Sequence, residues 1–316
     1  MNKTVLQVRN VSVAFGVPVA DHVSFELREG EFFALVGESG SGKSVTAMTL
    51  VQLLPRPGAK IISGEVILDG VDLLKIPLSE IRKYRGKRIS CIFQEPMLAL
   101  NPVLSIGAQL REVLRELSLA EAAERIEHFL NLAGFSGHAR ILKAFPHELS
   151  GGMLQRVCIV MALLPLPQVL IADEPTTALD VTVQAQVMDV LRKLARESKT
   201  AVLLITHNMG LVAQYAQRVG VLYAGQMVEM GDTDAVIRSP EHPYTRGLLA
   251  AIPEMNSTLK SLHAIPGSVP SPADYDSGCR FRTRCAFAVP VCQNPPPCKE
   301  TDSHFYRCWI RFSLQS

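Results

Sequence analysis

A stretch of eight residues has the composition and spacing of a loop that binds phosphate. Residues 37–44 read Gly-Glu-Ser-Gly-Ser-Gly-Lys-Ser, which fits the pattern G-x-x-x-x-G-K-[ST] at every position. Glycines let backbone N–H groups converge on phosphate oxygens, and a helix that starts at the loop adds the positive end of its dipole. Lys43 would lie between the β- and γ-phosphates of a nucleotide, and Ser44 would bind Mg²⁺. The predicted nucleotide contacts are Gly37, Glu38, Ser39, Gly40, Ser41, Gly42, Lys43, Ser44 and Val45.

Two adjacent carboxylates follow an apolar run further along the chain. The run Leu170-Ile171-Ala172 leads directly into Asp173 and Glu174. A strand here would deliver Asp173 to the carboxyl edge of a sheet, where it would hold the Mg²⁺ shell. Glu174 would polarise an attacking water as general base. Taken alone, the stretch is equally typical of a strand that ends in solvated acids.

A pair of glycines forms a second element that suits phosphate. Ser150, Gly151 and Gly152 precede a helical pattern, so they would open a helix and present N–H groups and a hydroxyl to phosphate. Two phosphate-facing elements so far apart in one chain predict that the nucleotide is bound between two chains.

The elements that must position these groups alternate between strand and helix. The phosphate loop lies between a predicted strand and a predicted helix, which is the context it requires. The alternation predicts an α/β fold with a parallel sheet, interrupted by a helical insertion at about residues 95–165. We predict strands at residues 5–15, 23–27, 32–36, 64–68, 88–93, 169–172, 201–206, 219–223 and 226–230, and a helix at 43–54.

Together these motifs resemble those of the ATP-binding-cassette (ABC) ATPases, and they occur in the family's order. Gln94 resembles the Q-loop glutamine, Ala178-Leu179-Asp180 the D-loop, His207 the switch histidine, and Phe15 the aromatic residue that stacks on adenine. The resemblance implies a RecA-like parallel sheet core, an antiparallel β subdomain and a helical subdomain, with ATP held in a head-to-tail pair of cassettes. It implies that Lys43, Gln94, Glu174 and His207 are catalytic, that Ser44, Gln94 and Asp173 hold Mg²⁺, and that Ser150, Gly151, Gly152 and Asp180 belong to the nucleotide site.

Segments outside the cassette motifs resemble the oligopeptide/dipeptide transporter branch of this family. They are residues 242–249, 265–270, 95–97 and 100–102, and Met153, where many ABC proteins have Gln, fits the same branch. The resemblance implies ATP hydrolysis that powers import of di- or oligopeptides or a related solute such as a nickel complex. It implies two integral-membrane permease subunits, a paralogous ATPase as dimer partner in preference to a second copy, and indirect contact with an extracytoplasmic solute-binding protein.

The sequence changes character after residue 254, where prolines become frequent. We therefore predict an ABC nucleotide-binding domain at residues 1–254 and a small, irregular, cysteine-rich C-terminal extension at 255–316. Such an extension buries little apolar surface, so something besides a hydrophobic core is expected to order it.

Five of the seven cysteines lie in this extension. Cys279, Cys285, Cys292 and Cys308 match the spacing with which several members of the branch bind a 4Fe–4S cluster. Cys298 is an extra thiol, which is either a spare or a replacement for Cys292 or Cys308 as ligand. Four thiolates suit Fe–S or zinc, but structural zinc sites usually have the tighter spacing C-x2–4-C. We therefore expect a 4Fe–4S cluster, with zinc or no metal as alternatives. The cluster's negative charge would be offset by Arg280, Arg282, Arg284 and Arg307.

Composition limits the remaining function classes. The net charge of +2 gives no reason to expect nucleic-acid binding through charge. No apolar run approaches the roughly 20 residues that span a bilayer, and the N-terminus has no signal-peptide pattern. We expect a peripheral protein at the cytoplasmic face of the inner membrane. The rivals are an ABC ATPase that acts on DNA or ribosomes, which usually has a coiled-coil insertion or tandem cassettes, and an iron–sulfur sensor with a regulatory cassette.

Overall fold

The computed structural model describes residues 3–177, 179–251, 265–301 and 304–310. Contacts between residues divide the chain into two compact units, each assembled from segments that are distant in sequence. The described residues of the extension group with the phosphate loop in the second unit, and the predicted domain boundary at residue 254 stays a prediction. The first unit comprises Met1–Val5, Leu27–Glu31 and Ile76–Leu204, and the second Leu6–Glu26, Phe32–Lys75 and Ile205–Ser316.

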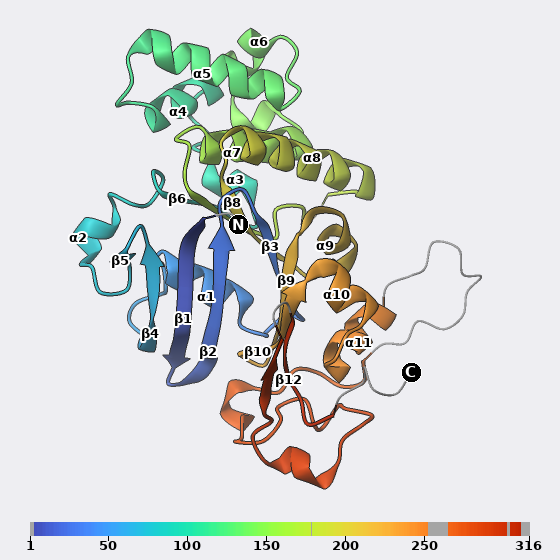
Figure 1. Cartoon of the computed structure of the whole chain (residues 1–316). Helices are drawn as coiled ribbons and strands as arrows, with labels where there is room; N and C mark the ends of the chain where they lie inside the picture. The colour runs from blue at the N-terminus through green and yellow to red at the C-terminus, as the bar shows by residue number, and fades with distance from the viewer. Residues whose placement is uncertain (1–2, 178, 252–264, 302–303, 311–316) are drawn as a thin grey trace. The chain divides into compact units, whose positions relative to one another are not determined.

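An antiparallel sheet forms one layer of the second unit. Its strands lie in the order β2-β1-β4-β5, and Figure 1 shows the three long ones side by side in blue. In the pairing of β1 with β4, Leu6 lies opposite Leu68 and Ala14 opposite Lys60. This sheet is the expected antiparallel subdomain. Its strands are β1 (Thr4–Phe15), β2 (Val17–Arg28), β4 (Lys60–Leu68) and β5 (Val71–Asp72).

A mixed sheet forms the other layer of this unit, with the strand order β11-β12-β10-β9-β3. Strand β3 is buried along its whole length, and all five of its residues are apolar. It runs parallel to β9. The strands are β3 (Phe32–Val36), β9 (Arg218–Tyr223), β10 (Gln226–Asp232), β11 (Cys298–Glu300) and β12 (His304–Arg307). The helices are α1 (Lys43–Leu50), α9 (Met209–Tyr215), α10 (Thr233–Arg238) and α11 (Pro243–Ala250).

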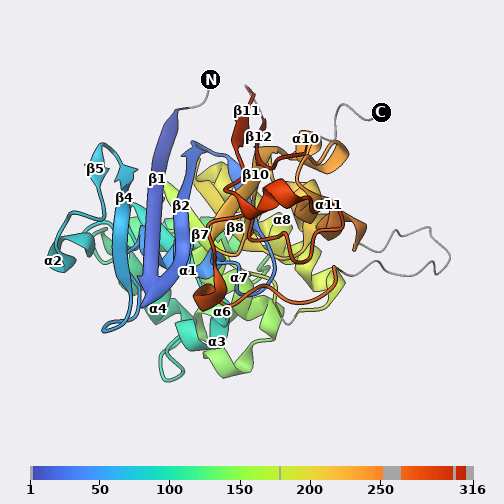
Figure 2. The ribbon, with the colours of Figure 1, turned by 90° about the horizontal axis from the view of Figure 1, so that it is seen from below.

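The extension is more regular than its prolines suggested. Its strand β12 pairs antiparallel with β10, so that Tyr306 lies opposite Glu229, and Figure 2 shows β11 and β12 beside β10. Two short 3₁₀ turns, Pro272–Asp274 and Pro290–Gln293, complete its described elements. Phe281 is buried in the core cluster that also contains residues of β3, β9 and α11. The extension is therefore ordered by a hydrophobic core after all, one that it shares with the cassette.

The first unit contains the strands in the order β8-β7-β6, with β6 and β7 parallel. Helices fill the interval 96–163, where the sequence predicted a helical insertion, and α7 contacts both α8 and β6. No helix among the described residues is long and apolar enough to cross a bilayer. The elements are α2 (Leu78–Ile81), β6 (Ile89–Ile92), α3 (Pro96–Ala99), α4 (Ile106–Val113), α5 (Leu119–Leu132), α6 (His138–Lys143), the 3₁₀ turn Pro146–Glu148, α7 (Gly151–Leu163), β7 (Val169–Asp173), α8 (Val181–Glu197) and β8 (Ala201–Thr206).

Candidate functional site

The glycine-rich loop joins β3 to α1 in the second unit, and its backbone leaves no room for side chains at two positions. A Cβ atom on Gly37 would lie 2.2 Å from the carbonyl oxygen of Leu222. A Cβ on Gly42, whose φ is +100°, would lie 2.8 Å from the carbonyl oxygen of Val19. Glycine is therefore required at both ends of the loop, as the motif predicted.

Lys43 turns back into the curve of this loop. Its side-chain ammonium donates to the carbonyl oxygens of Gly37 at 2.8 Å and Glu38 at 2.9 Å, and the residue is only 6% exposed. The N–H of Gly225 donates to the carbonyl of Ser41 at 2.9 Å, which ties the loop to the turn between β9 and β10. A buried ammonium within a glycine-lined backbone curve fits the phosphates of a nucleoside triphosphate with its Mg²⁺.

Two further expected residues of the second unit lie at strand ends. Phe15 is the last residue of β1 and is half-buried. His207 directly follows β8 and is exposed, while its neighbour Asn208 caps α9 by accepting from the N–H groups of Gly210 and Leu211. These positions are those that the family resemblance implied, and the roles of both residues stay predictions.

The carboxylate pair lies in the first unit, at the end of β7. Asp173 is the last residue of the strand, and Glu174 follows with a φ of +47°. Two donors meet the same oxygen of Glu174: the Thr177 hydroxyl at 2.8 Å and the Gln94 side-chain amide at 3.3 Å. A left-handed backbone at a non-glycine residue costs on the order of 1–3 kcal/mol and is typical of functional sites. The structure thus brings Gln94 and Glu174 together, although 80 residues separate them.

The second phosphate-facing element opens α7, as predicted. Ser150 caps the helix by accepting from the N–H of Met153 at 3.4 Å, and both Ser150 and Gly151 are exposed while Gly152 is half-buried. Asp180 caps α8 in the same manner, accepting from the N–H of Val183 at 2.9 Å. Ala178, the first residue of the expected D-loop, lies outside the described residues.

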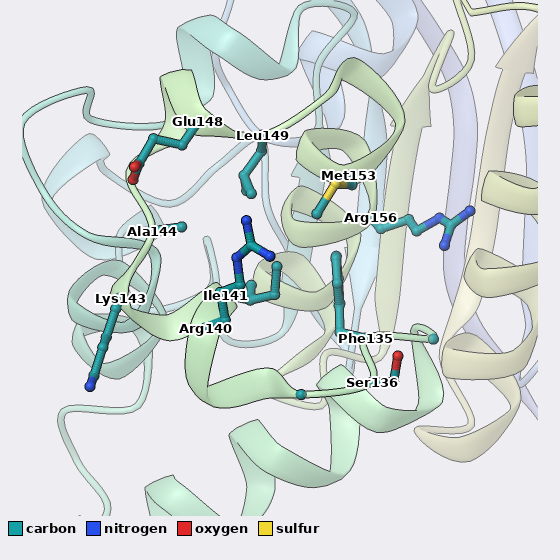
Figure 3. A pocket seen from close by; sticks show the side chains of 12 residues that line it. Phe135, Ser136, Arg140, Ile141, Lys143, Ala144, Glu148, Leu149, Met153 and Arg156 are labelled. Atoms are coloured by element: carbon teal, nitrogen blue, oxygen red, sulfur yellow. The ribbon is translucent and has the colours of Figure 1, made fainter.

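A cleft of about 700 Å³ borders this element on its N-terminal side. None of the expected catalytic residues lines it. The lining residues are 134–137, Arg140, Ile141, Lys143, Ala144, Glu148, Leu149, Met153 and Arg156. Figure 3 shows the guanidinium of Arg140 pointing into the cleft toward Leu149. The cleft is basic on balance, and the sequence motifs did not predict it.

The expected iron–sulfur cluster is contradicted by the structure. No group of three or more His, Cys, Asp or Glu side chains in the described part of the chain is arranged to hold a metal ion. Burial raises the pKa of the Cys279 thiol to about 11 and also raises the pKa values of Cys285 and Cys308. Cys279, Cys285, Cys292 and Cys308 do line one cavity, but its volume of about 10 Å³ is no larger than a single water needs.

The arginines of the extension have a different role from the one expected for them. Arg280 donates to the carbonyl of Ala224 and pairs with Asp21, both at 2.6 Å. Arg284 pairs with Glu38 of the phosphate loop. With the cluster excluded, the rival interpretation as an iron–sulfur sensor loses its basis. The sequence motifs did not indicate that Arg284 touches the loop.

Known proteins resemble this chain over nearly its whole length. Residues 20–177 match the family model described as ABC transporter, and residues 228–292 match the oligopeptide/dipeptide transporter C-terminal region. The oligopeptide transport ATP-binding protein AppD of Bacillus subtilis (strain 168) is 46% identical over 93% of this chain and 92% of its own length. The dipeptide transport ATP-binding protein DppD of the same organism is 43% identical over 97% and 95%.

Solved structures show the same fold. The ATP-binding cassette MJ0796, solved as a dimer in a post-hydrolysis state with ADP and Pi, superimposes with a TM-score of 0.63 at 28% identity over 72% of this chain and 98% of that one. With both the cassette and the extension matched, the chain belongs to the ABC transporter family, in its oligopeptide/dipeptide branch.

Proposed function

We propose that this chain is the ATP-hydrolysing subunit of an ABC importer that takes up di- or oligopeptides or a related small solute. The observation that carries the proposal is the presence of both matches, the cassette and the oligopeptide/dipeptide extension, in one chain. Relatives that are similar over more than nine-tenths of the chain are named as peptide transport ATP-binding proteins. An ATPase acting on nucleic acid is disfavoured because the relatives and the extension both point to transport.

ATP would bind with its phosphates in the curve of residues 37–45. The buried ammonium of Lys43, already directed into that curve, supplies positive charge to the phosphates. Mg²⁺ would be held by Ser44, Gln94 and Asp173, and when bound it would neutralise charge that develops on the phosphates. Phe15 would stack on the adenine ring.

Glu174 would orient and polarise the water that attacks the γ-phosphate. Thr177 and Gln94 both donate to one of its carboxylate oxygens. These hydrogen bonds fix the orientation of the side chain and therefore also the direction of its second oxygen. His207 would contact the γ-phosphate. The attacking water must be held in line with the leaving group, and a carboxylate with a fixed orientation positions that water better than a mobile one.

A second cassette would complete the nucleotide site. Ser150 and Gly151 at the start of α7 are exposed, and Val181, next to Asp180, is an apolar side chain that is 82% exposed. Exposed apolar and phosphate-facing groups close to one another suit an interface that closes on nucleotide. We propose that the facing cassette is a paralogous ATPase, arranged head to tail with this chain.

The helical insertion would dock on the permease subunits at the cytoplasmic face of the inner membrane, where a solute-binding protein delivers the solute from the other side. Leu98 and Val103 are 80% and 76% exposed. A groove of about 480 Å³ next to them is lined by the basic residues Arg82, Arg85, Lys87 and Arg115. Apolar and basic groups together favour an amphipathic, acidic segment of a partner.

The proposal is tested by replacing Glu174 with Gln. We expect ATP binding to be retained and hydrolysis to slow by about 10²–10⁴, the range for a lost general base. Glu197→Gln, which removes an exposed glutamate that pairs with His128, is the matched control and should hydrolyse ATP at the wild-type rate. Normal turnover by the Glu174 variant would refute the assignment of the base.

A further inference from the structure

A short segment of the extension, residues 279–285, reaches the phosphate loop, and we call it the arginine strap. Arg280, Arg282 and Arg284 alternate along it. The first pairs with Asp21 and the last with Glu38, whereas the middle one pairs with Asp276 of the extension itself. Between them, Phe281 packs on the rings of Tyr223 and Tyr244 at centroid distances of 5.1 and 5.4 Å. The strap therefore has two arginines bound to the cassette and one bound locally.

Arg284 holds Glu38 with both ends of its guanidinium. Its two terminal nitrogens lie 3.2 and 3.0 Å from the two carboxylate oxygens of Glu38, which is a bidentate pair. The Arg284 side chain is 5% exposed and that of Glu38 is 30% exposed. The remaining nitrogen of Arg284 donates to the carbonyl of Pro266 at 2.8 Å, so the guanidinium is itself fixed by the extension.

The backbone of Glu38 is held as well. Its N–H donates to the hydroxyl of Tyr244 at 2.8 Å, and Tyr244 belongs to α11, outside the phosphate-loop motif. Its carbonyl accepts from the ammonium of Lys43. Glu38 is thus bound at once by the loop's own lysine, by α11 and by the extension.

The charge of Glu38 opposes the chemistry that the loop performs. A carboxylate in a loop that binds a triphosphate repels the phosphates, and a repulsion between like charges is strong where the groups are partly buried. An arginine paired with that carboxylate cancels the repulsion and, because the pair is bidentate, fixes the side chain in one orientation.

We propose that Arg284 is a positioning residue of the phosphate loop: it neutralises and orients Glu38, so that nucleotide affinity depends on the docked extension. The proposal rests on the proposed function, namely that residues 37–45 bind ATP. It differs from a merely structural role in one respect, which is that its effect must disappear when the charge of Glu38 is removed.

The test is a double-mutant cycle in the full-length chain, with binding of a fluorescent (mant) ATP analogue and Mg²⁺ as the readout. Arg284→Gln should weaken nucleotide binding about tenfold, because it leaves the Glu38 carboxylate unpaired beside the phosphates. Glu38→Gln is the reference background of the cycle, because it removes the charge that Arg284 neutralises, and its own affinity is measured alongside. The double variant should recover to within about twofold of Glu38→Gln.

Ionic strength gives a second, independent readout. Salt screens the repulsion between charges, and raising NaCl from 50 mM to 500 mM shortens the Debye length by about threefold. The loss of nucleotide affinity in Arg284→Gln, relative to the wild type, should therefore be smaller at 500 mM NaCl. Arg282→Gln is the matched control, because it removes a neighbouring strap arginine that pairs with Asp276 of the extension. This variant should bind nucleotide normally at both salt concentrations.

Three outcomes would overturn the proposal. They are wild-type affinity in Arg284→Gln, a double variant that is as much weaker than Glu38→Gln as Arg284→Gln is weaker than the wild type, or a loss of affinity that salt does not change. If Arg284→Gln does not fold, Arg284→Lys supplies the test. A lysine keeps the positive charge but cannot form the bidentate pair, so this variant should lose some nucleotide affinity, by a factor below ten. Lys43→Ala separates the two proposals. If that variant binds nucleotide normally, the loop is not the ATP site, and the failure belongs to the proposed function.

Discussion

At the scale of single residues, Gly37 is the position of the phosphate loop with the least room. A Cβ there would meet a backbone oxygen at 2.2 Å and the Ser41 hydroxyl at 2.7 Å, whereas Gly30, which also has a positive φ, has no atom within 4 Å. We predict that Gly37→Ala lowers the free energy of unfolding by about 2–4 kcal/mol, from overpacking and backbone strain together. Gly30→Ala should cost only about 1–2 kcal/mol, from strain alone. Urea unfolding of both variants checks this, and equal losses would contradict it.

The residues of the nucleotide site could be predicted only as far as their motifs are local. The loop at 37–44 is readable because each glycine, the lysine and the serine act through neighbours in sequence. The left-handed backbone of Glu174 could not be predicted, because glutamate as a residue type does not favour a positive φ. The pairing of Arg284 with Glu38 joins residues 246 positions apart, and only tertiary packing creates it. The roles of Phe15 and His207 rest on family resemblance and stay predictions.

At the scale of elements, the extension and the phosphate-loop strand share one hydrophobic core. Phe281 is 4% exposed and contacts Tyr223 and Tyr244. We predict that Phe281→Ala lowers the free energy of unfolding by about 3–5 kcal/mol, because it removes a buried ring and leaves a cavity. Phe287→Ala, which removes a half-exposed ring of the same extension, should change it by no more than about 0.5 kcal/mol. Similar effects in both variants would show that the extension does not share the core.

The N-cap of α11 makes stability depend on pH. His242 is fully buried, and its ring nitrogen accepts from the N–H of Tyr244 at 3.1 Å. Burial lowers the pKa of His242 to about 3. Between pH 6.5 and 3 the unfolded chain therefore binds a proton that the folded chain does not, and the free energy of unfolding falls as the pH falls.

We expect this histidine to contribute a loss of about 2 kcal/mol between pH 7.5 and pH 5. His242→Asn keeps an oxygen that can cap the helix and removes the titration. The change in unfolding free energy between the two pH values should therefore be smaller in the variant than in the wild type, as measured by urea unfolding. An unchanged pH dependence would contradict the assignment.

Elements with continuous apolar runs were predictable, and those that depend on distant partners were not. The strands predicted at 32–36, 169–172 and 201–206 lie at 32–36, 169–173 and 201–206, because short continuous apolar runs favour buried strands. The helix α1 ends at Leu50, earlier than its following prolines suggested, because Gln52 takes a left-handed backbone. Strand β12 has only four residues and pairs with β10. The sequence predicted β10 as a strand at 226–230, but no local pattern could reveal that β12 would pair with it.

At the scale of the whole molecule, composition and motif order predicted the family, whereas the cysteine spacing gave a wrong prediction of a cluster. Spacing alone does not report how thiols are buried, and these are packed around a cavity of about 10 Å³. The exposed start of α7 and the exposed Val181 remain to be covered by a partner in the proposed assembly.

We predict that a complex purified through a tag on this chain contains one copy of this chain, one paralogous ATPase and two permease subunits. A head-to-tail pair needs a facing phosphate loop for each exposed Ser150, and permeases need a docking surface such as the helical insertion. Native mass spectrometry of the detergent-solubilised complex gives the stoichiometry. A complex with two copies of this chain and no paralogue would contradict the heterodimer and indicate a homodimer. A complex without permeases would refute the role in import.

The pairing of β12 with β10 has a consequence for how the protein is made. Tyr306 meets Glu229 only after 77 further residues have been added, which takes a ribosome roughly 4–15 s at about 5–20 residues per second. Throughout that interval β10 lacks the strand that pairs with its edge, and until residue 281 is added Tyr223 and Tyr244 also lack the ring of Phe281. Nascent chains of this length therefore expose a strand edge beside aromatic side chains, which is the surface that chaperones bind and that aggregates grow from.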